Sequence, residues 1–224
     1  MDLFQLQTFV DRLRLETIGE PHYNANHKVF EYADHSPIVV VILKLLRAVH
    51  GLYAMESLRA SGLFIDFGAT IRMVNDCVEE VYFILEAYPK APSTNVTQFV
   101  NGFFEHSIDN YLDATTEPVA RNKIRNAVVR VLHNGNQDEA TRVRVEHIYK
   151  TFCGYIHANY VHIMEVYGGS LPSFNLSGVP SLNQREIRKE HVKLAIDAVA
   201  LATAFAASKL QREALNVEIT TAID

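Results

Sequence analysis

The chain contains no tryptophan and only two cysteines, so phenylalanine and tyrosine supply its aromatic bulk. The cysteines, Cys77 and Cys153, fall inside helical patterns and do not form a CxxC pair. This usage disfavours both a disulfide framework and a thiolate zinc site. We therefore expect a cytoplasmic protein in a reducing compartment.

Several loop signatures of nucleotide-binding and hydrolytic enzymes are also missing. The sequence contains no GxGxxG, GxxxxGK[ST], GxSxG or HExxH motif. It also lacks the Glu-x-x-His pairs from which di-iron helical bundles are built. His162 and Glu165 are three residues apart and offer only two ligands to a metal ion. The sequence thus predicts neither a metal nor a cofactor.

No segment reads as a membrane anchor. The N-terminal residues lack the basic region and apolar run of a signal peptide. The most apolar runs, 37–43 and 198–207, are shorter than the roughly 20 residues needed to cross a bilayer. We expect a protein that starts at Met1 and does not insert into a membrane.

Helical periodicity covers most of the 224 residues, and a content of 48% hydrophobic and 21% charged residues is typical of a globular protein. We predict an all-α, single-domain bundle of about seven helices over residues 1–224. Its parts are an N-terminal helix and connector (1–36), core helices (37–168), a long connector (169–183) and a C-terminal helix (184–216). The alanine-rich run 195–207 allows close helix approach, as in a central core helix or the seam of a homodimer.

Charge is unevenly distributed along the chain. The formal net charge is -5, yet residues 121–150 carry seven basic and three acidic side chains. Such a block is typical either of solvated helix faces or of a local phosphate-binding surface. RNA is therefore a possible partner of residues 121–150.

Polar side chains interrupt an apolar pattern in the helix predicted over 138–167. His157, Asn159 and Tyr160 occur among residues with a core-like pattern, and Tyr149 lies on the adjacent apolar stripe. Buried polar groups need hydrogen-bond partners, so these side chains either join a network or face a cleft. We predict that Tyr149, Asn159 and Tyr160 take part in binding.

A helix predicted over 66–88 carries a charged stripe that includes Arg72, Glu79 and Glu80. Apolar residues fill much of the remaining circumference, so the stripe should border the core. One interpretation is an ion network between helices. The other is a catalytic site in which His157 acts as a general acid or base beside Arg72, Glu79 and Glu80.

Three segments, IRMVNDCVEE (71–80), YKTFCGYIHANY (149–160) and FNLSG (174–178), resemble uncharacterised bacterial all-helical families over about 40–180. Those families distantly resemble the HEPN superfamily, which includes metal-independent ribonucleases with an Arg-x4-6-His motif. This resemblance implies two candidate pairs, Arg142 with His147 and Arg185 with His191. Of these, Arg142 and His147 lie in the basic block, where phosphates would be attracted.

Three functions remain open at this point. We favour a binding or accessory module, and the resemblance implies a connection with bacterial defence or toxin systems. The alternatives are a HEPN-like RNA endonuclease and a small-molecule-binding protein with residues 174–178 as a lid. The sequence does not decide whether the protein is an enzyme.

Overall fold

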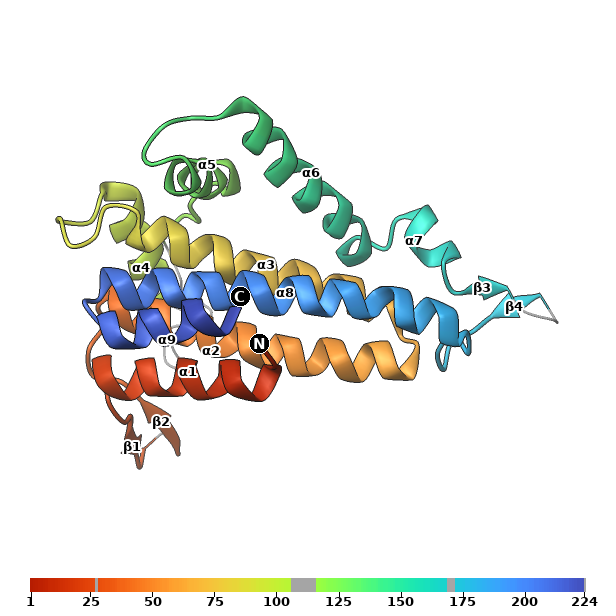
Figure 1. Ribbon diagram of the computed structural model, residues 1–224, viewed down its shortest axis with the longest axis horizontal. Coiled ribbons are helices and arrows are strands. Elements are labelled where there is room, and N and C mark those ends of the chain that lie inside the picture. The colour runs from red at the N-terminus through yellow and green to blue at the C-terminus, as the bar shows by residue number, and fades with distance from the viewer. Residues whose placement is uncertain (27, 106–115, 169–171, 224) are drawn as a thin grey trace.

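The computed structural model describes residues 1–26, 28–105, 116–168 and 172–223, and these ranges form a mostly helical single body. The helices are α1 (Leu3–Thr17), α2 (Pro37–Ser61), α3 (Phe64–Leu85), α4 (Thr94–Glu105), α5 (Arg121–Leu132), α6 (Glu139–Ile156), α7 (Tyr160–Met164), α8 (Leu182–Lys209) and α9 (Glu213–Ile223). The helices α1, α2, α3, α8 and α9 run side by side, while α5 and α6 lie along one side of this group (Figure 1). The predicted all-α bundle is confirmed, with nine helices in the described ranges instead of about seven.

Helix α2 is the centre of the bundle, where it packs against α1, α3, α4 and α8. Ser36 and Pro37 start it, because proline at the first helical position lacks the N–H that would be unpaired there. Gly62 ends it in the left-handed conformation, at φ 76°. In the run that begins at Val39, residues on most sides of the helix are buried. The sequence of this run is therefore apolar throughout and lacks a strong helical hydrophobic periodicity.

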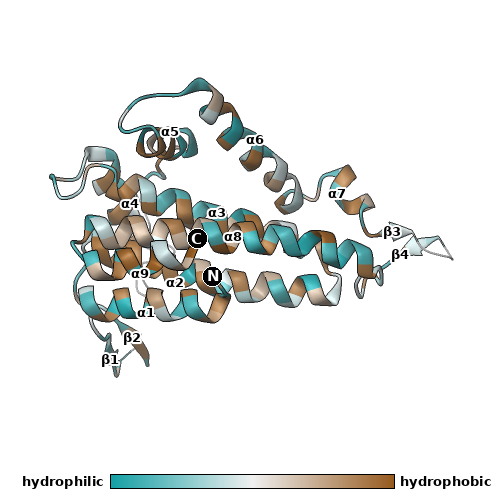
Figure 2. Ribbon diagram, in the orientation of Figure 1, coloured by the Kyte–Doolittle hydropathy of each residue, from teal (hydrophilic) through white to brown (hydrophobic). Residues whose placement is uncertain are grey.

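The alanine-rich part of α8 also belongs to the core. Ala200, Ala202 and Ala206 are fully buried, and α8 packs against α1, α2, α3 and α9. Small side chains let these helices approach closely. The core-helix interpretation of 195–207 therefore accounts for the pattern. Figure 2 shows hydrophobic and hydrophilic residues alternating around α3, α6 and α8, as expected for helices with one buried face.

The single helix predicted over 138–167 is wrong. Helix α6 ends at Ile156, Ala158 adopts a positive φ of 48°, and α7 begins at Tyr160. The break folds α7 back so that the His162 ring covers Gly154, where a Cβ would overlap the ring. Contact between α7 and the end of α6 thus replaces continued helix.

The single C-terminal helix predicted over 184–216 is also wrong. Helix α8 ends at Lys209, and Gln211 has a φ of 59° in the turn that leads to α9. This turn lets α9 return along α8 and α1, and it buries Leu215 and Ile219. Burial of these two apolar side chains stabilises the turn relative to a continued helix.

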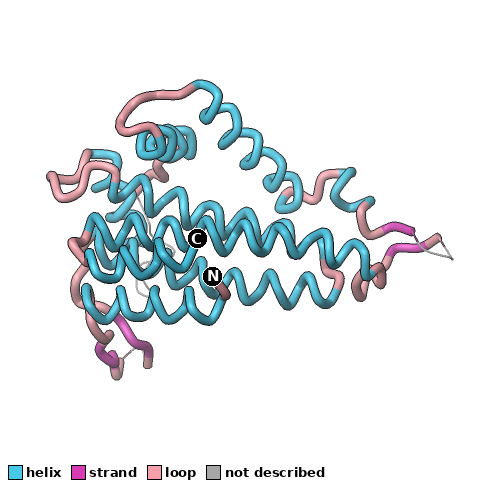
Figure 3. Tube along the Cα trace, viewed as in Figure 1, coloured by secondary structure: helices cyan, strands magenta, loops and turns pink. Residues whose placement is uncertain are grey.

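The first predicted connector contains a short hairpin, and a second hairpin begins just before the other connector. Strand β1 (His22–Asn24) pairs with β2 (Val29–Glu31), and β3 (Tyr167–Gly168) pairs with β4 (Ser173–Phe174). Figure 3 shows these strands at the ends of the molecule, away from the bundle centre. They do not alter the helical architecture.

A second, smaller core anchors the segment after α7. Phe64 is fully buried and packs with Val166 and Val179, apart from the main core. The Val179 N–H donates to the Gly62 carbonyl at 2.9 Å. At Gly178, with φ +115°, a Cβ would overlap the Ser61 carbonyl oxygen. The second connector is therefore fixed to the turn between α2 and α3.

By length and composition alone, α2 and α8 are each apolar enough to cross a membrane. However, 56% and 50% of their most apolar stretches, respectively, are buried within the bundle. Core helices of soluble proteins pass the same test, so the two helices are weak evidence in either direction. The absence of a membrane span stays a prediction.

Candidate functional site

The stripe predicted on 66–88 forms the centre of a charged cluster between α2, α3, α5 and α6. Arg72, Glu79 and Glu80 are only 4%, 9% and 7% exposed. We call the following set the charged cluster: Lys44, Arg72, Asp76, Glu79, Glu80, Arg121, Arg125, Tyr149 and Cys153. The three residues singled out from the sequence of α3 therefore lie at the centre of the charged cluster.

Arg121, the first residue of α5, connects the acidic side chains of α3. Its guanidinium pairs with Asp76, with Glu79 Oε2 at 3.0 Å and with Glu80 Oε1 at 2.5 Å. The other Glu80 oxygen lies 2.7 Å from Lys44 Nζ. These ion pairs hold α2, α3 and α5 together. No sequence pattern indicated that Arg121 rather than His157 would lie beside these carboxylates.

Tyr149 connects the cluster to α6. Its ring lies between two guanidinium groups, 4.0 Å from that of Arg72 and 3.9 Å from that of Arg125. One turn further along α6, Cys153 Sγ accepts a hydrogen bond from Arg72 Nε at 3.5 Å. Stacked guanidinium groups keep their edges available for carboxylates, which suits an ion network.

His157 does not take the predicted position beside Arg72, Glu79 and Glu80. It is exposed at the C-cap of α6, one turn beyond Cys153, because the helix ends there. Asn159 and Tyr160 are exposed as well, after the break. The cluster contains Tyr149 but none of these three, and the expected acid or base beside Arg72 is absent from the described contacts.

The two predicted nuclease pairs are not preorganised as single sites. Arg142 and His147 lie on one continuous helix, where five residues turn by about 500° and leave the side chains roughly 140° apart. Arg142 is also paired with Glu139 at 2.6 Å and with Glu146 at 3.4 Å. In the other pair, Arg185 donates to the Val179 carbonyl at 3.0 Å. His191 instead lines a separate cavity.

The basic block 121–150 divides into two groups. Arg121 and Arg125 turn toward the bundle, as described above. Arg130 pairs with Glu86, and Lys150 lies 2.8 Å from Glu146. Much of the positive charge is therefore neutralised within the chain. RNA binding by this block stays a prediction.

Burial raises the pKa of Glu79 to about 7, although Arg72 and Arg125 act in the opposite direction. Burial also raises the pKa of Glu80 against the attraction of Lys44. On the cationic side, burial and then the charge of Arg72 lower the pKa of Arg121 to about 10. Desolvation is therefore the largest effect on these three groups.

The raised Glu79 pKa predicts a pH-dependent stability. The native carboxyl holds its proton to higher pH than the unfolded one. The contribution of Glu79 to the free energy of unfolding is therefore complete below pH 4.5 and is lost as pH rises through about 7. The free energy of unfolding should fall between mildly acidic and mildly alkaline pH, and in Glu79→Gln this fall should be smaller by up to about 3 kcal/mol. Urea titrations at both pH values measure it.

The matched control is Glu146→Gln on α6. Lys150 lowers the pKa of this exposed carboxylate, so the substitution should not reduce the loss at alkaline pH. Equal pH profiles for the wild type and Glu79→Gln would contradict the expectation.

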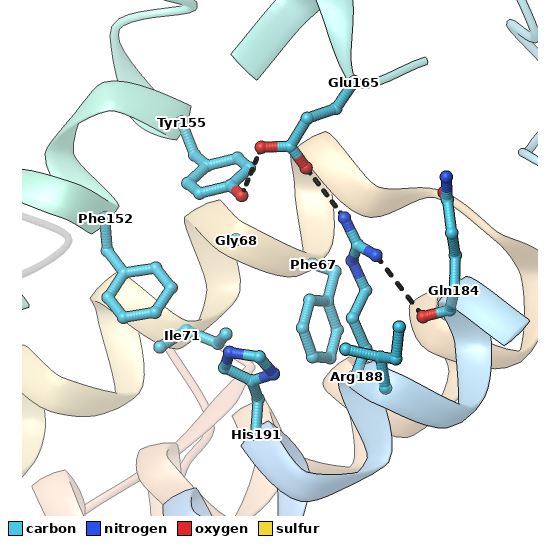
Figure 4. Close-up of a pocket in the computed structure, with 10 residues that line it drawn as sticks. Phe67, Gly68, Ile71, Phe152, Tyr155, Glu165, Gln184, Arg188 and His191 are labelled. Atoms are coloured by element: carbon cyan, nitrogen blue, oxygen red, sulfur yellow. Dashed lines mark hydrogen bonds and ion pairs between the residues drawn. The ribbon is translucent and has the colours of Figure 1, made fainter. Parts of the chain in front are cut away.

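A second polar feature, which the sequence did not reveal, is a cavity of about 340 Å³ between α3, α6 and the first half of α8. Its apolar walls come mainly from Phe67 and Ile71 of α3 and Phe152 of α6. Figure 4 shows the two phenylalanine rings on opposite sides of the space and His191 between them at one edge. We call this the α3–α6–α8 cavity.

A chain of hydrogen bonds closes one end of the cavity. The Tyr155 hydroxyl donates to Glu165 Oε1 at 2.7 Å, and Arg188 Nη2 donates to Glu165 Oε2 at 2.8 Å (Figure 4). The Arg188 guanidinium also stacks 3.8 Å from the ring of Phe64 in the second core. Burial, followed by hydrogen bonding to Glu165, raises the Tyr155 pKa. The phenol therefore stays protonated at neutral pH.

Glycines position the aromatic side of this cavity. A Cβ at Gly68 would overlap the Tyr155 ring, so glycine lets α6 lie close against α3 there. The His162 ring meets the Tyr155 ring at a centroid distance of 4.1 Å and covers Gly154. Gly68 and Gly154 inside helical patterns were the only sequence signal of these approaches.

The predicted lid, residues 174–178, is not part of this cavity. The cavity is lined by α3, α6, Glu165 and α8, whereas residues 174–178 contribute none of its lining. Those residues are fixed elsewhere: Asn175 N–H donates to the Val166 carbonyl at 2.8 Å. Among the described residues, no group of three or more His, Cys, Asp or Glu side chains is arranged to hold a metal ion.

Comparison with known proteins gives no further assignment. The chain matches no protein-family model, no curated protein and no solved structure. The resemblance to HEPN-like families therefore stays a prediction, and function has to be argued from the geometry.

Proposed function

We propose that the protein is a binding module whose α3–α6–α8 cavity takes a small organic ligand. The observation that carries this proposal is a space of about 340 Å³ with apolar walls and a hydrogen-bonded polar end. Ligand sites in proteins are typically clefts of about 300 to 1,000 Å³ with this combination of lining. The charged cluster, in contrast, supports a structural role because Lys44 and Arg121 pair its carboxylates across three helices.

The polar end of the cavity favours binding over catalysis. Each Glu165 oxygen already accepts a hydrogen bond, one from Tyr155 and one from Arg188. The raised Tyr155 pKa keeps that phenol from acting as a base at neutral pH. His191 lies at the exposed edge, and no described carboxylate orients its ring. A general base of the kind expected in an enzyme is therefore not preorganised.

The test is to block the cavity without disturbing the core. Ile187 lines it yet is 55% exposed, so Ile187→Trp should fill the space at little cost in stability. A panel of single-ring aromatic fragments is screened by ligand-detected NMR against the wild type and this variant. We expect some fragments to bind the wild type and to lose at least tenfold in affinity on Ile187→Trp.

Leu194→Trp is the matched control. Leu194 is also an exposed apolar residue of α8, two turns further along and outside the cavity lining. It should leave fragment binding unchanged. The proposal fails if no fragment binds, or if Ile187→Trp binds as tightly as Leu194→Trp.

A further inference from the structure

A second cavity, of about 270 Å³, lies beside the charged cluster and is lined by residues of α2, α3, α4 and α5. We call it the α4–α5 cavity. Phe99 and Phe103 of α4 form the aromatic part of its lining. Lys44, Glu80 and Arg121 of the charged cluster form part of its polar lining. The cavity therefore places an apolar wall next to charged groups.

The ammonium group of Lys44 is within reach of this cavity. Its Nζ lies 5.7 Å from the centroid of the Phe99 ring and 5.2 Å from that of the Phe103 ring. The side chain of Lys44 is 21% exposed, whereas Arg72 at the centre of the cluster is only 4% exposed. A molecule that enters the α4–α5 cavity can therefore meet the Lys44 ammonium but not the Arg72 guanidinium.

Lys44 has hydrogen-bonding capacity left for a ligand. An ammonium group carries three N–H donors. Within the part of the chain that the structure describes, its polar contact is with Glu80 Oε2, at 2.7 Å. The phenylalanine rings add a cation–π attraction but accept no conventional hydrogen bond. A ligand carboxylate would supply acceptors for the remaining donors.

The charged cluster carries more positive than negative groups. Its cations are Lys44, Arg72, Arg121 and Arg125, and its carboxylates are those of Asp76, Glu79 and Glu80. Four cations and three carboxylates leave a formal charge of +1, and the raised pKa of Glu79, about 7, increases this excess near neutral pH. Buried charge without a counter-charge is costly.

The nearby carboxylates outside the cluster do not cancel this excess. Glu146 of α6 is already paired with Arg142 and Lys150. Glu117 lines the α4–α5 cavity, but it is exposed, so solvent screens its charge. A single negative charge from a ligand would balance the formal excess.

We infer that the α4–α5 cavity takes a small organic monocarboxylate, whose carboxylate accepts hydrogen bonds from Lys44 and whose apolar body lies against Phe99 and Phe103. This site is separate from the α3–α6–α8 cavity. The inference therefore does not depend on the proposed function.

Three probes with the same ring test the ligand class at neutral pH. Benzoate is an anion, benzamide is uncharged and benzylamine is a cation. We expect benzoate to bind at least about tenfold more tightly than benzamide or benzylamine in ligand-detected NMR titrations, because hydrogen bonds between charged groups are stronger than neutral ones.

Two substitutions should change the affinity for benzoate in opposite directions. Lys44→Met removes the ammonium group, so benzoate should bind no more tightly than benzamide. Glu80→Gln keeps the shape of the side chain but removes the carboxylate that competes for Lys44, so benzoate should bind at least about threefold more tightly. Glu80→Gln decides the question even if Lys44→Met does not fold, because a purely apolar cavity would not respond to the loss of a carboxylate.

Arg47→Met is the matched control. Arg47 is an exposed cation of α2, three residues after Lys44, and it is not part of the cavity lining. Its substitution should leave the preference for benzoate unchanged. Circular dichroism establishes that each variant is folded.

The inference is overturned if benzoate does not bind, if benzamide or benzylamine binds as tightly, or if Lys44→Met retains the preference. Equal affinities of the wild type and Glu80→Gln for benzoate would also overturn it. So would benzoate binding that Ile187→Trp abolishes, because the anion would then occupy the α3–α6–α8 cavity. Fragments that bind without responding to Ile187→Trp would instead overturn only the proposed function.

Discussion

Replacing Arg121 with methionine is expected to lower the free energy of unfolding by about 3 to 5 kcal/mol. Its guanidinium serves three carboxylates of α3, and only 26% of its side chain is exposed. Methionine preserves much of the packing volume but leaves Asp76, Glu79 and Glu80 with fewer partners. Removing one member of a buried ion network is costly because the others stay desolvated. Urea unfolding monitored by circular dichroism measures the loss.

Two comparisons separate electrostatics from packing. Arg142→Met removes an exposed arginine that pairs with Glu139 and Glu146 on its own helix, and it should leave stability nearly unchanged. The loss caused by Arg121→Met should also be smaller at mildly acidic pH. There Glu79, with its pKa near 7, is already protonated, so removal of its cationic partner costs less free energy. A loss equal to that of Arg142→Met, or independent of pH, would contradict this role for Arg121.

The elements that the sequence predicted well are those with local signals. Ser36, Pro37 and Gly62 mark the ends of α2 through backbone chemistry that acts within one turn. The stripe of Arg72, Glu79 and Glu80 was predicted to border the core because apolar neighbours fill the rest of α3. Such patterns depend on residues that are close in sequence.

The errors arose where distant contacts decide the structure. Nothing local ends α6 before His157, since Ala158 and its neighbours are compatible with helix. The break depends on the His162 ring returning to Gly154. Once the helix ends, the polar residues that followed it become exposed, and the predicted site beside Arg72 loses its histidine. Arg121, 41 residues after Glu80, occupies the position that pairs with the carboxylates.

The α3–α6–α8 cavity was missed for the same reason. Tyr155, Glu165 and Arg188 come from three separate segments, and no spacing rule relates them. Gly68, like Gly154, could have indicated a close approach, because glycine inside a helix lowers its stability unless packing requires it. Without the partner helix, that glycine does not specify what approaches it.

Phe64→Ala should release the second core without unfolding the main bundle. Phe64 is fully buried and packs with Val166 and Val179, and its ring also supports Arg188 at the cavity. Removing a buried phenylalanine side chain costs about 3 to 5 kcal/mol. Because the second core is separate from the main one, most of this loss should appear as local opening of the segment that contains α7 and the β3–β4 hairpin.

Amide hydrogen exchange measures this local opening. The N–H groups of Val166, Asn175 and Val179 donate within the segment or to Gly62, so they should exchange about 100-fold faster in Phe64→Ala. Phe83→Ala is the matched control, since Phe83 is a buried phenylalanine of the same helix but belongs to the main core. That variant should instead accelerate exchange throughout the bundle. If both variants gave the same pattern, the second core would be part of one cooperative unit with the bundle. The position of Arg188 would then depend on the whole fold and not on Phe64 alone.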